Sequence, residues 1–307
     1  MSEPIFRIIE SVDEAKEIWD RLSPHKTIDD EWAFRYTFIR DLPYKIHFIV
    51  AYEADQPVAF LPLQLNNREG LQPPYAPTDI DFLEFFGGDD TDDNGILQKE
   101  TNKSREEAIL KQVKSPCILA PLASETLGGR AAELYTSKYV LPLAGYKNYE
   151  EYIEVMWQGS SRKKLRQQMR GLYNKYTIEI INNNYNDLDR LFDLNIKRFG
   201  DSSSLSTPRR RQIFRNLSEL YSVEMISIRV DGKVESVSYG INYKQTYIGM
   251  NAGTNTDIQD LGKLLVLLQI GRAIQLGCTA YDGGKGSGVW KEEFKFNKIP
   301  QYLLRLP

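Results

Sequence analysis

Residues that suit anion binding gather at the start of one predicted helix near the C-terminus. A predicted strand ends at Asn251, a polar loop follows, and residues 261–276 form a helix that is apolar on nearly every side. Its first turn contains Gly262 and Lys263. The N-terminus of a buried helix presents free N–H groups and a positive dipole end, an arrangement that binds phosphate. The alternative is that Asp260 only caps the helix and Gly262 only relieves a tight packing contact.

A second group of candidates follows that helix. An apolar strand ends in Tyr281 and Asp282 and leads into a glycine-rich turn and a short helix that carries Lys291. Ligands bind at the carboxyl ends of strands in open α/β sheets, so both strand residues lie where chemistry is expected. The glycines match neither a Walker loop nor a dinucleotide fingerprint, which argues against nucleotide hydrolysis and hydride transfer. The alternatives are that Asp282 caps the turn and that Lys291 is a surface residue.

The positions of the histidines argue against a hydrolase triad. His25 and His47 both lie in the N-terminal half, away from these candidates. Direct attack by a substrate amine needs only a group that takes its proton. Asp282, Tyr281 or Tyr247 could do so, directly or through water.

The predicted helix over residues 160–176 is a third candidate. Arg162, Arg166 and Arg170 recur every four residues and therefore line one helix face. An arginine stripe is suited to phosphate or carboxylate. The alternative is a solvated helix face.

One acidic run resembles a metal site only in part. Asp90, Asp92 and Asn94 match the opening of a calcium-binding loop, but the twelfth position is Thr101, and Glu100 comes one place early. We therefore expect an acidic turn and no metal.

The elements that carry these residues are predicted to occur in two similar series. A strand, two helices, three strands, a helix and a strand are expected in the N-terminal half, and a similar order follows residue 160. The strongest hairpin signal is the Asp231-Gly232 turn between two strands. The sequence therefore predicts domains over residues 1–149 and 150–307.

Charge differs between the two halves. Residues 1–150 hold 16 Lys and Arg against 26 Asp and Glu, net −10, whereas residues 151–307 hold 23 against 16, net +7. This asymmetry is consistent with an anionic ligand in or beside the C-terminal half, and equally with solvated surface charge. No stretch approaches the roughly 20 apolar residues that cross a bilayer, and the acidic N-terminus does not read as a signal peptide. We expect a cytoplasmic protein.

Three short motifs resemble the CelD-like branch of the GNAT superfamily, which is related to the Fem-type peptidoglycan aminoacyltransferases. They are the run DLGKLL that ends at Leu265, the run YDGGKG with Asp282 and Gly286, and the run WKEEF in which Trp290 and Lys291 precede Phe294. Two positions depart from the family pattern. Asp260 and Leu261 replace the usual lead-in of a small residue or serine with proline, and Trp290 stands where Tyr or Phe is commoner.

The resemblance implies an α/β (α+β) fold with tandem GNAT-like domains, each a mixed, mostly antiparallel sheet flanked by helices. It also implies that the pyrophosphate of acyl-CoA lies on the loop and helix start, and that Lys291 stabilises negative charge at the reacting carbonyl. The residues expected to bind this cofactor are Asn251, Asp260, Leu261, Gly262, Lys263 and Leu264. Asp282, Lys291 and Tyr281 are the expected catalytic residues, and Arg162, Arg166, Tyr247 and Trp290 the expected substrate-binding residues.

The expected function is N-acyl transfer from acyl-CoA, with acetyl-CoA as the expected donor. The acceptor would be an amine or hydroxyl of an amino sugar, an amino acid or a cell-surface polysaccharide precursor. One alternative is a Fem-type transferase that uses aminoacyl-tRNA, although no heptad-patterned arm is present; no other nucleic-acid partner is expected. Another is a non-catalytic scaffold in surface-polymer assembly. The oligomeric state is not predicted.

Overall fold

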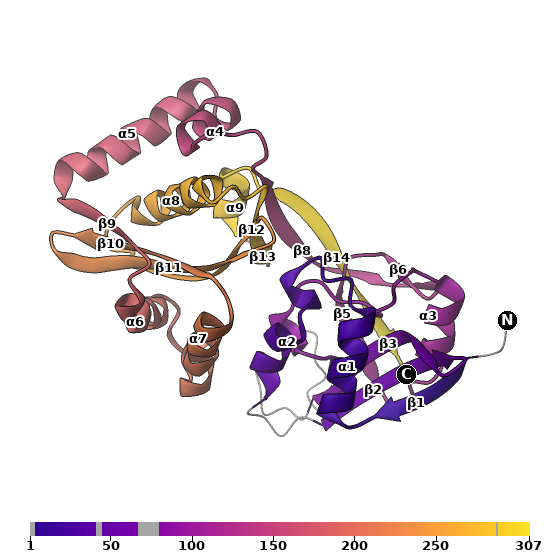
Figure 1. The fold of residues 1–307 in the computed structure, drawn as a ribbon. Coiled ribbons are helices and arrows are strands. Elements are labelled where there is room, and N and C mark those ends of the chain that lie inside the picture. Colours follow the sequence, from indigo (N-terminus) through magenta and orange to yellow (C-terminus); the bar gives the residue numbers. More distant parts are fainter. Residues whose placement is uncertain (1–3, 41–44, 67–79, 287) are drawn as a thin grey trace. The chain divides into compact units, whose positions relative to one another are not determined.

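The computed structural model describes residues 4–40, 45–66, 80–286 and 288–307. The chain forms two compact units, an N-terminal unit of Met1–Lys138 with Ile299–Pro307 and a C-terminal unit of Tyr139–Lys298 (Figure 1). This division differs from the expected 1–149 and 150–307. Strand β14 (Asn297–Leu306) pairs antiparallel with β5 (Cys117–Leu122), so the last residues complete the sheet of the N-terminal unit.

The sheet of the N-terminal unit has the strand order β1-β2-β3-β4-β5-β14. Its neighbours are antiparallel except for β4 and β5. The hairpin between β2 and β3 turns at Ala54 and Asp55, both of which have positive φ. The remaining elements of this unit are β1 (Ile5–Ile9), α1 (Val12–Leu22), α2 (Trp32–Ile39), β2 (Lys45–Glu53), β3 (Gln56–Asn66), β4 (Phe82–Phe85), α3 (Lys103–Leu110), β6 (Thr126–Leu127), β7 (Arg130–Ala131) and β8 (Glu133–Pro142), which continues into the C-terminal unit.

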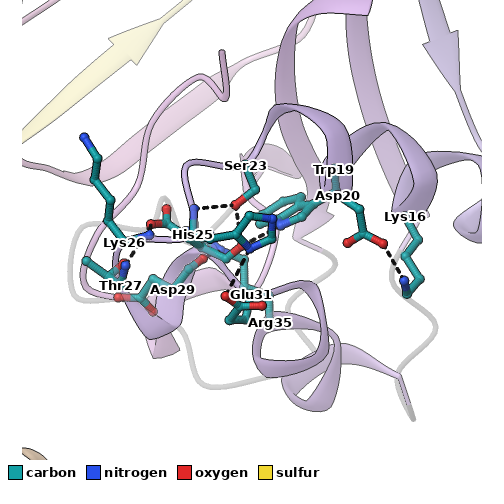
Figure 2. A network of polar contacts seen from close by, with 11 residues as sticks. Lys16, Trp19, Asp20, Ser23, His25, Lys26, Thr27, Asp29, Glu31 and Arg35 are labelled. Atoms are coloured by element: carbon teal, nitrogen blue, oxygen red, sulfur yellow. Dashed lines mark hydrogen bonds and ion pairs between the residues drawn. The ribbon is translucent and has the colours of Figure 1, made fainter. Parts of the chain in front are cut away.

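A network of polar contacts fixes the connection between α1 and α2 (Figure 2). The indole N–H of Trp19 and the hydroxyl of Ser23 both donate to the carbonyl of Asp30. The carboxylate of Asp30 accepts the amides of Lys26 and Thr27. Trp19 is fully buried. Because a buried indole N–H needs a partner, this network holds the turn against the end of α1.

Buried Arg35 of α2 organises the acidic run that resembles a calcium-binding loop. Its guanidinium donates to the carbonyls of Phe86 and Asp93 and to Oδ1 of Asn94. The carboxylate of Asp29 in turn accepts the amides of Asp92 and Asp93. The side chains of Asn94 and Asp29 are thus used inside the protein, and the run folds as an acidic turn held by α2.

The C-terminal unit contains a sheet with the order β13-β12-β11-β10-β9 and helices on both of its faces (Figure 1). Only β12 and β13 are parallel. The predicted Asp231-Gly232 turn joins β10 and β11, and both of its residues have positive φ. The elements are α4 (Tyr149–Met156), α5 (Gly159–Lys175), β9 (Ile178–Asn182), α6 (Leu188–Phe199), α7 (Pro208–Leu220), β10 (Val223–Val230), β11 (Lys233–Tyr243), β12 (Thr246–Thr254), α8 (Leu261–Gln275), β13 (Ala280–Lys285) and α9 (Val289–Glu293).

Helix α8 packs centrally in this unit. Leu261, Leu264 and Leu265 join Leu172 of α5 and Ile226 of β10 in one hydrophobic cluster. Burial on several sides explains why its sequence is apolar nearly all round. The mixed, mostly antiparallel sheets flanked by helices confirm the expected fold class. Among the described residues, no helix is both long and apolar enough to span a bilayer.

Candidate active site

Strands β12 and β13 separate part of the way along their length. They pair in parallel from Thr246 opposite Ala280 to Ile248 opposite Asp282. Beyond that point β12 continues to Thr254 and β13 to Lys285 without further pairing. Backbone groups on the facing edges therefore have no strand partner there. The gap opens at the carboxyl ends of two parallel strands, where α/β sheets bind ligands.

A cavity of about 460 Å³ occupies this gap, and we call it the donor cavity. Its walls come from the end of α6, from β12 and β13, from the first half of α8 and from α9. The volume falls in the range of small-molecule sites. The predicted site residues that line the cavity are Asn251, Gly262, Lys263, Tyr281 and Trp290.

The first turn of α8 lines the donor cavity and contains backbone amides that make no helical hydrogen bond. The amide of Leu264 makes the first hydrogen bond of the helical ladder, to the carbonyl of Asp260, so the amides of Gly262 and Lys263 lie ahead of that ladder. Asp260 makes no side-chain cap, and its carboxylate accepts from Nε2 of Gln168. A Cβ built on Gly262 would meet only Thr254, at 4.0 Å. Neither capping by Asp260 nor tight packing accounts for this sequence.

Leu261 and Leu264 do not reach the cavity. Both are buried in the hydrophobic core of the unit. Their contribution to the site is to anchor the first turn of α8.

Asn251 belongs to an amide network in the cavity wall. Its Oδ1 accepts from Nδ2 of Asn195 and from the amide of Ala252, each at 2.8 Å. The hydroxyl of Ser203 donates to Oδ1 of Asn195 at 2.6 Å. These bonds hold the wall of β12 against α6 on the side of the gap.

Two buried tyrosines stand where the strands begin to separate. The rings of Tyr247 and Tyr281 meet edge to face at 4.9 Å. A Cβ at Gly249 would lie 2.8 Å from the Tyr281 ring, so only glycine leaves room for it. Burial raises the pKa of Tyr281 well above its usual value, and the neighbouring Tyr247 and Asp282 add to the shift. Burial also raises the pKa of Tyr247. Both phenols therefore keep their protons at neutral pH.

Asp282 lies on the other side of its strand. Side chains alternate along a strand, and Tyr281 and Gly283 line the cavity whereas Asp282 does not. Its Oδ1 accepts the amide of Gly284 at 2.9 Å. This contact is the turn cap given above as the alternative role of Asp282.

Lys291 holds the glycine-rich turn together. Its ammonium donates to the carbonyls of Gly284, Lys285 and Gly286 at 3.0, 3.0 and 3.2 Å. The residue is only 6% exposed, and its Nζ lies 5.0 Å from the centroid of the Tyr139 ring. Lys291 does not line the donor cavity, whereas its neighbour Trp290 does. The structure therefore places Lys291 behind the cavity wall.

Arg162 and Arg166 lie apart from these residues. Both line a second cavity on the opposite side of α8, and both pair with Glu154 of α4. The residues expected to bind substrate therefore do not form one site. Trp290 lines the donor cavity, whereas Tyr247 is buried and does not line it.

Several cavity residues were not expected from the sequence. Asn195, Arg198 and Phe199 come from the end of α6, and Gln269 and Glu293 come from α8 and α9. Only Asn195 could have been identified from the sequence, because a polar residue on the buried face of an amphipathic helix needs a hydrogen-bond partner. The others have no local pattern that marks them.

Comparisons with known proteins agree with this geometry. Residues 159–295 match the family described as acetyltransferase (GNAT) domain. A conserved protein of unknown function from Bacteroides thetaiotaomicron VPI-5482 has a TM-score of 0.60 at 10% identity, covering 99% of this chain and 100% of that one. FemX has a TM-score of 0.60 at 10% identity, with 98% and 97% covered. No curated protein sequence matches the chain.

A structure described as a tandem GNAT protein from the clavulanic acid biosynthesis pathway has a TM-score of 0.51 at 9% identity, with 99% of this chain and 98% of that one covered. Likeness at such identities concerns the fold, and it extends over both units. The family match contains every residue that lines the donor cavity. Residues 159–295 therefore belong to the GNAT family and form an acyltransferase domain, in a chain with the fold of tandem GNAT proteins.

Proposed function

We propose that this protein transfers an acyl group from acyl-CoA to an amine, with the donor in the gap between β12 and β13. The observation that carries the proposal is the separation of the two strands beside the open start of α8. A gap between strands takes an extended thioester arm, and a helix N-terminus takes phosphate. Acetyl-CoA is the proposed donor, and the cytoplasm, where acyl-CoA is available, the proposed location.

The residues at the start of α8 fit the phosphates of CoA. Gly262 and Lys263 line the cavity with amides that lie ahead of the helical ladder, and the glycine leaves space for an anion. Lys263 and Arg198 supply positive charge to the same cavity. Arg198 forms no ion pair among the described residues, so its charge is available to a ligand.

The chemistry requires one bond to form and one to break. The neutral amine attacks the thioester carbonyl, the new C–N bond forms, and the C–S bond breaks to release CoA as a thiolate. The amine proton leaves to solvent or to a base, and the thiolate takes up a proton. Tyr281 is a protonated phenol at the cavity wall, so we assign it the role of proton donor to the leaving sulfur.

The proposed acceptor is an amine, or a hydroxyl, of an amino sugar, an amino acid or a polysaccharide precursor. The amide side chains of Asn251 and Gln269 line the donor cavity, and Trp290 offers an aromatic surface. Amide side chains with an aromatic face are suited to a hydroxylated, ring-shaped acceptor.

Release of free CoA thiol in the presence of an amine panel tests the proposal. The purified chain is incubated with acetyl-CoA and glucosamine, free amino acids or UDP-linked amino sugars, and products are identified by mass spectrometry. We expect one class to gain the mass of an acetyl group as thiol is released. Acyl transfer only from aminoacyl-tRNA, or no transfer from any donor, would contradict it in favour of the Fem-type or scaffold alternative.

A further inference from the structure

The second cavity, which we call the helical cavity, measures about 590 Å³ and lies between α4, α5 and α8. It uses a different side of α8 from the donor cavity. Leu264, Leu267 and Leu268 line the helical cavity, whereas Gly262, Lys263, Leu265, Val266 and Gln269 line the donor cavity. Helix α8 therefore separates the two spaces, and a ligand in one does not occupy the other.

The floor of the helical cavity is apolar. Ile153, Leu165, Leu264 and Leu267 line it, and each is at most 4% exposed. Met169 also lines it and packs against the same hydrophobic clusters. An apolar floor of this kind gains free energy from an alkyl chain that covers it.

The rim carries an excess of positive charge. Arg162, Lys163, Arg166 and Arg170 line the cavity against a single carboxylate, Glu150. Glu154 of α4 pairs with Arg162 and Arg166. Lys163 and Arg170 form no ion pair within the described part of the chain, so two exposed cations on one side of the rim have no fixed anion.

We propose that the helical cavity binds a single-chain anionic amphiphile. Its phosphate or carboxylate head lies between Lys163 and Arg170, and its alkyl chain covers the apolar floor. A free anion would use the rim but leave the floor exposed, and a neutral chain would use the floor but leave the cations without an anion. Only a molecule with both parts complements both surfaces. This inference is independent of acyl transfer in the donor cavity.

Calorimetric titration of the full chain with dodecyl phosphate, below its micelle concentration, tests this proposal. We expect saturable binding of one molecule. The double variant Lys163→Gln with Arg170→Gln should weaken it at least tenfold. The control is Lys164→Gln, which removes one positive charge from the same helix but lines a different surface groove. Gly262→Glu, which alters only the donor cavity, should leave binding of dodecyl phosphate unchanged.

Two further experiments test whether binding needs the cavity itself and whether it needs both the headgroup and the alkyl chain. Met169→Trp should fill the cavity and abolish binding while the melting temperature shows a folded chain. Inorganic phosphate and dodecanol should each bind at least tenfold more weakly than dodecyl phosphate. Equal binding of either one, loss of binding in Gly262→Glu, or an equal loss in Lys164→Gln and the double variant would overturn the proposal.

Discussion

The ammonium of Lys263 lies 2.6 Å from Oε1 of Glu293, and both side chains line the donor cavity. The pair joins the first turn of α8 to the end of α9. Both side chains are partly exposed, so the pair is weak and screened by salt. Lys263, which lies in the first turn of α8 beside the open amides, is therefore paired with the carboxylate of Glu293.

Glu293→Gln should tighten the binding of free CoA by about threefold at low salt, because Lys263 is released to the phosphates. Lys263→Gln should weaken it by a similar factor. Titration calorimetry at about 0.02 M and 0.5 M salt checks both changes, since screening should shrink them. Weaker binding in Glu293→Gln would contradict this role for the pair.

Tyr281→Phe should lower kcat by about 10- to 100-fold with little change in KM for the donor, because it removes the proposed proton donor to the thiolate. Tyr247→Phe is the matched control, since this buried phenol contacts the Tyr281 ring but does not line the donor cavity. Steady-state kinetics of both variants, with their melting temperatures, separate a chemical role from a packing role. Equal losses of kcat would show that Tyr281 acts only through packing.

Lys291→Met should lower the free energy of unfolding by about 2 kcal/mol, because three partly buried carbonyls lose their charged donor. The exposed Lys298→Met is the control and should change stability little. Urea denaturation monitored by circular dichroism gives both values. An unchanged stability with a large loss of kcat would instead support direct action of Lys291 on the reacting carbonyl.

The N-terminal unit should lose stability as pH rises toward neutrality. Burial raises the pKa of Glu84 to about 7, although hydrogen bonds from Gln64 and Asn66 oppose the shift. Between roughly pH 4.5 and 7 the folded chain retains a proton that the unfolded chain has released, so unfolding becomes easier with rising pH and the effect levels off above that window.

Glu84→Gln should therefore stabilise the protein at pH 8 by on the order of 2 kcal/mol and by much less at pH 5. Exposed Glu133→Gln provides the control. Melting curves at both pH values measure this difference in stability. A gain in stability that does not depend on pH would refute ionisation of Glu84 as the cause.

The start of α8 was predictable because its signal is local. A long apolar run that begins after a polar loop with a glycine defines both the helix and its open end, and Gly262 and Lys263 do line the donor cavity. The hairpin turns were predictable for the same reason, since Asp231 and Gly232 adopt the positive φ that such a turn needs.

Features that depend on distant pairing were not predictable. The separation of β12 from β13 is a property of register between strands, and β14 joins a sheet whose other strands lie far away in sequence. The carbonyl partners of Lys291 belong to the backbone, which has no sequence signature. Tyr281 and Asp282 were both expected to be catalytic, yet alternation along a strand turns neighbouring side chains to opposite sides.

Binding of acetyl-CoA, measured by thermal shift, is the decisive test of a donor site at the start of α8. A ligand that binds only the folded chain must raise its melting temperature. We expect a saturable rise in the natural chain and in Gly171→Glu, which adds the same charge at an open helical position outside the donor cavity, and no rise in Gly262→Glu. No rise in the natural chain, or an undiminished rise in Gly262→Glu, would contradict a donor site at the start of α8.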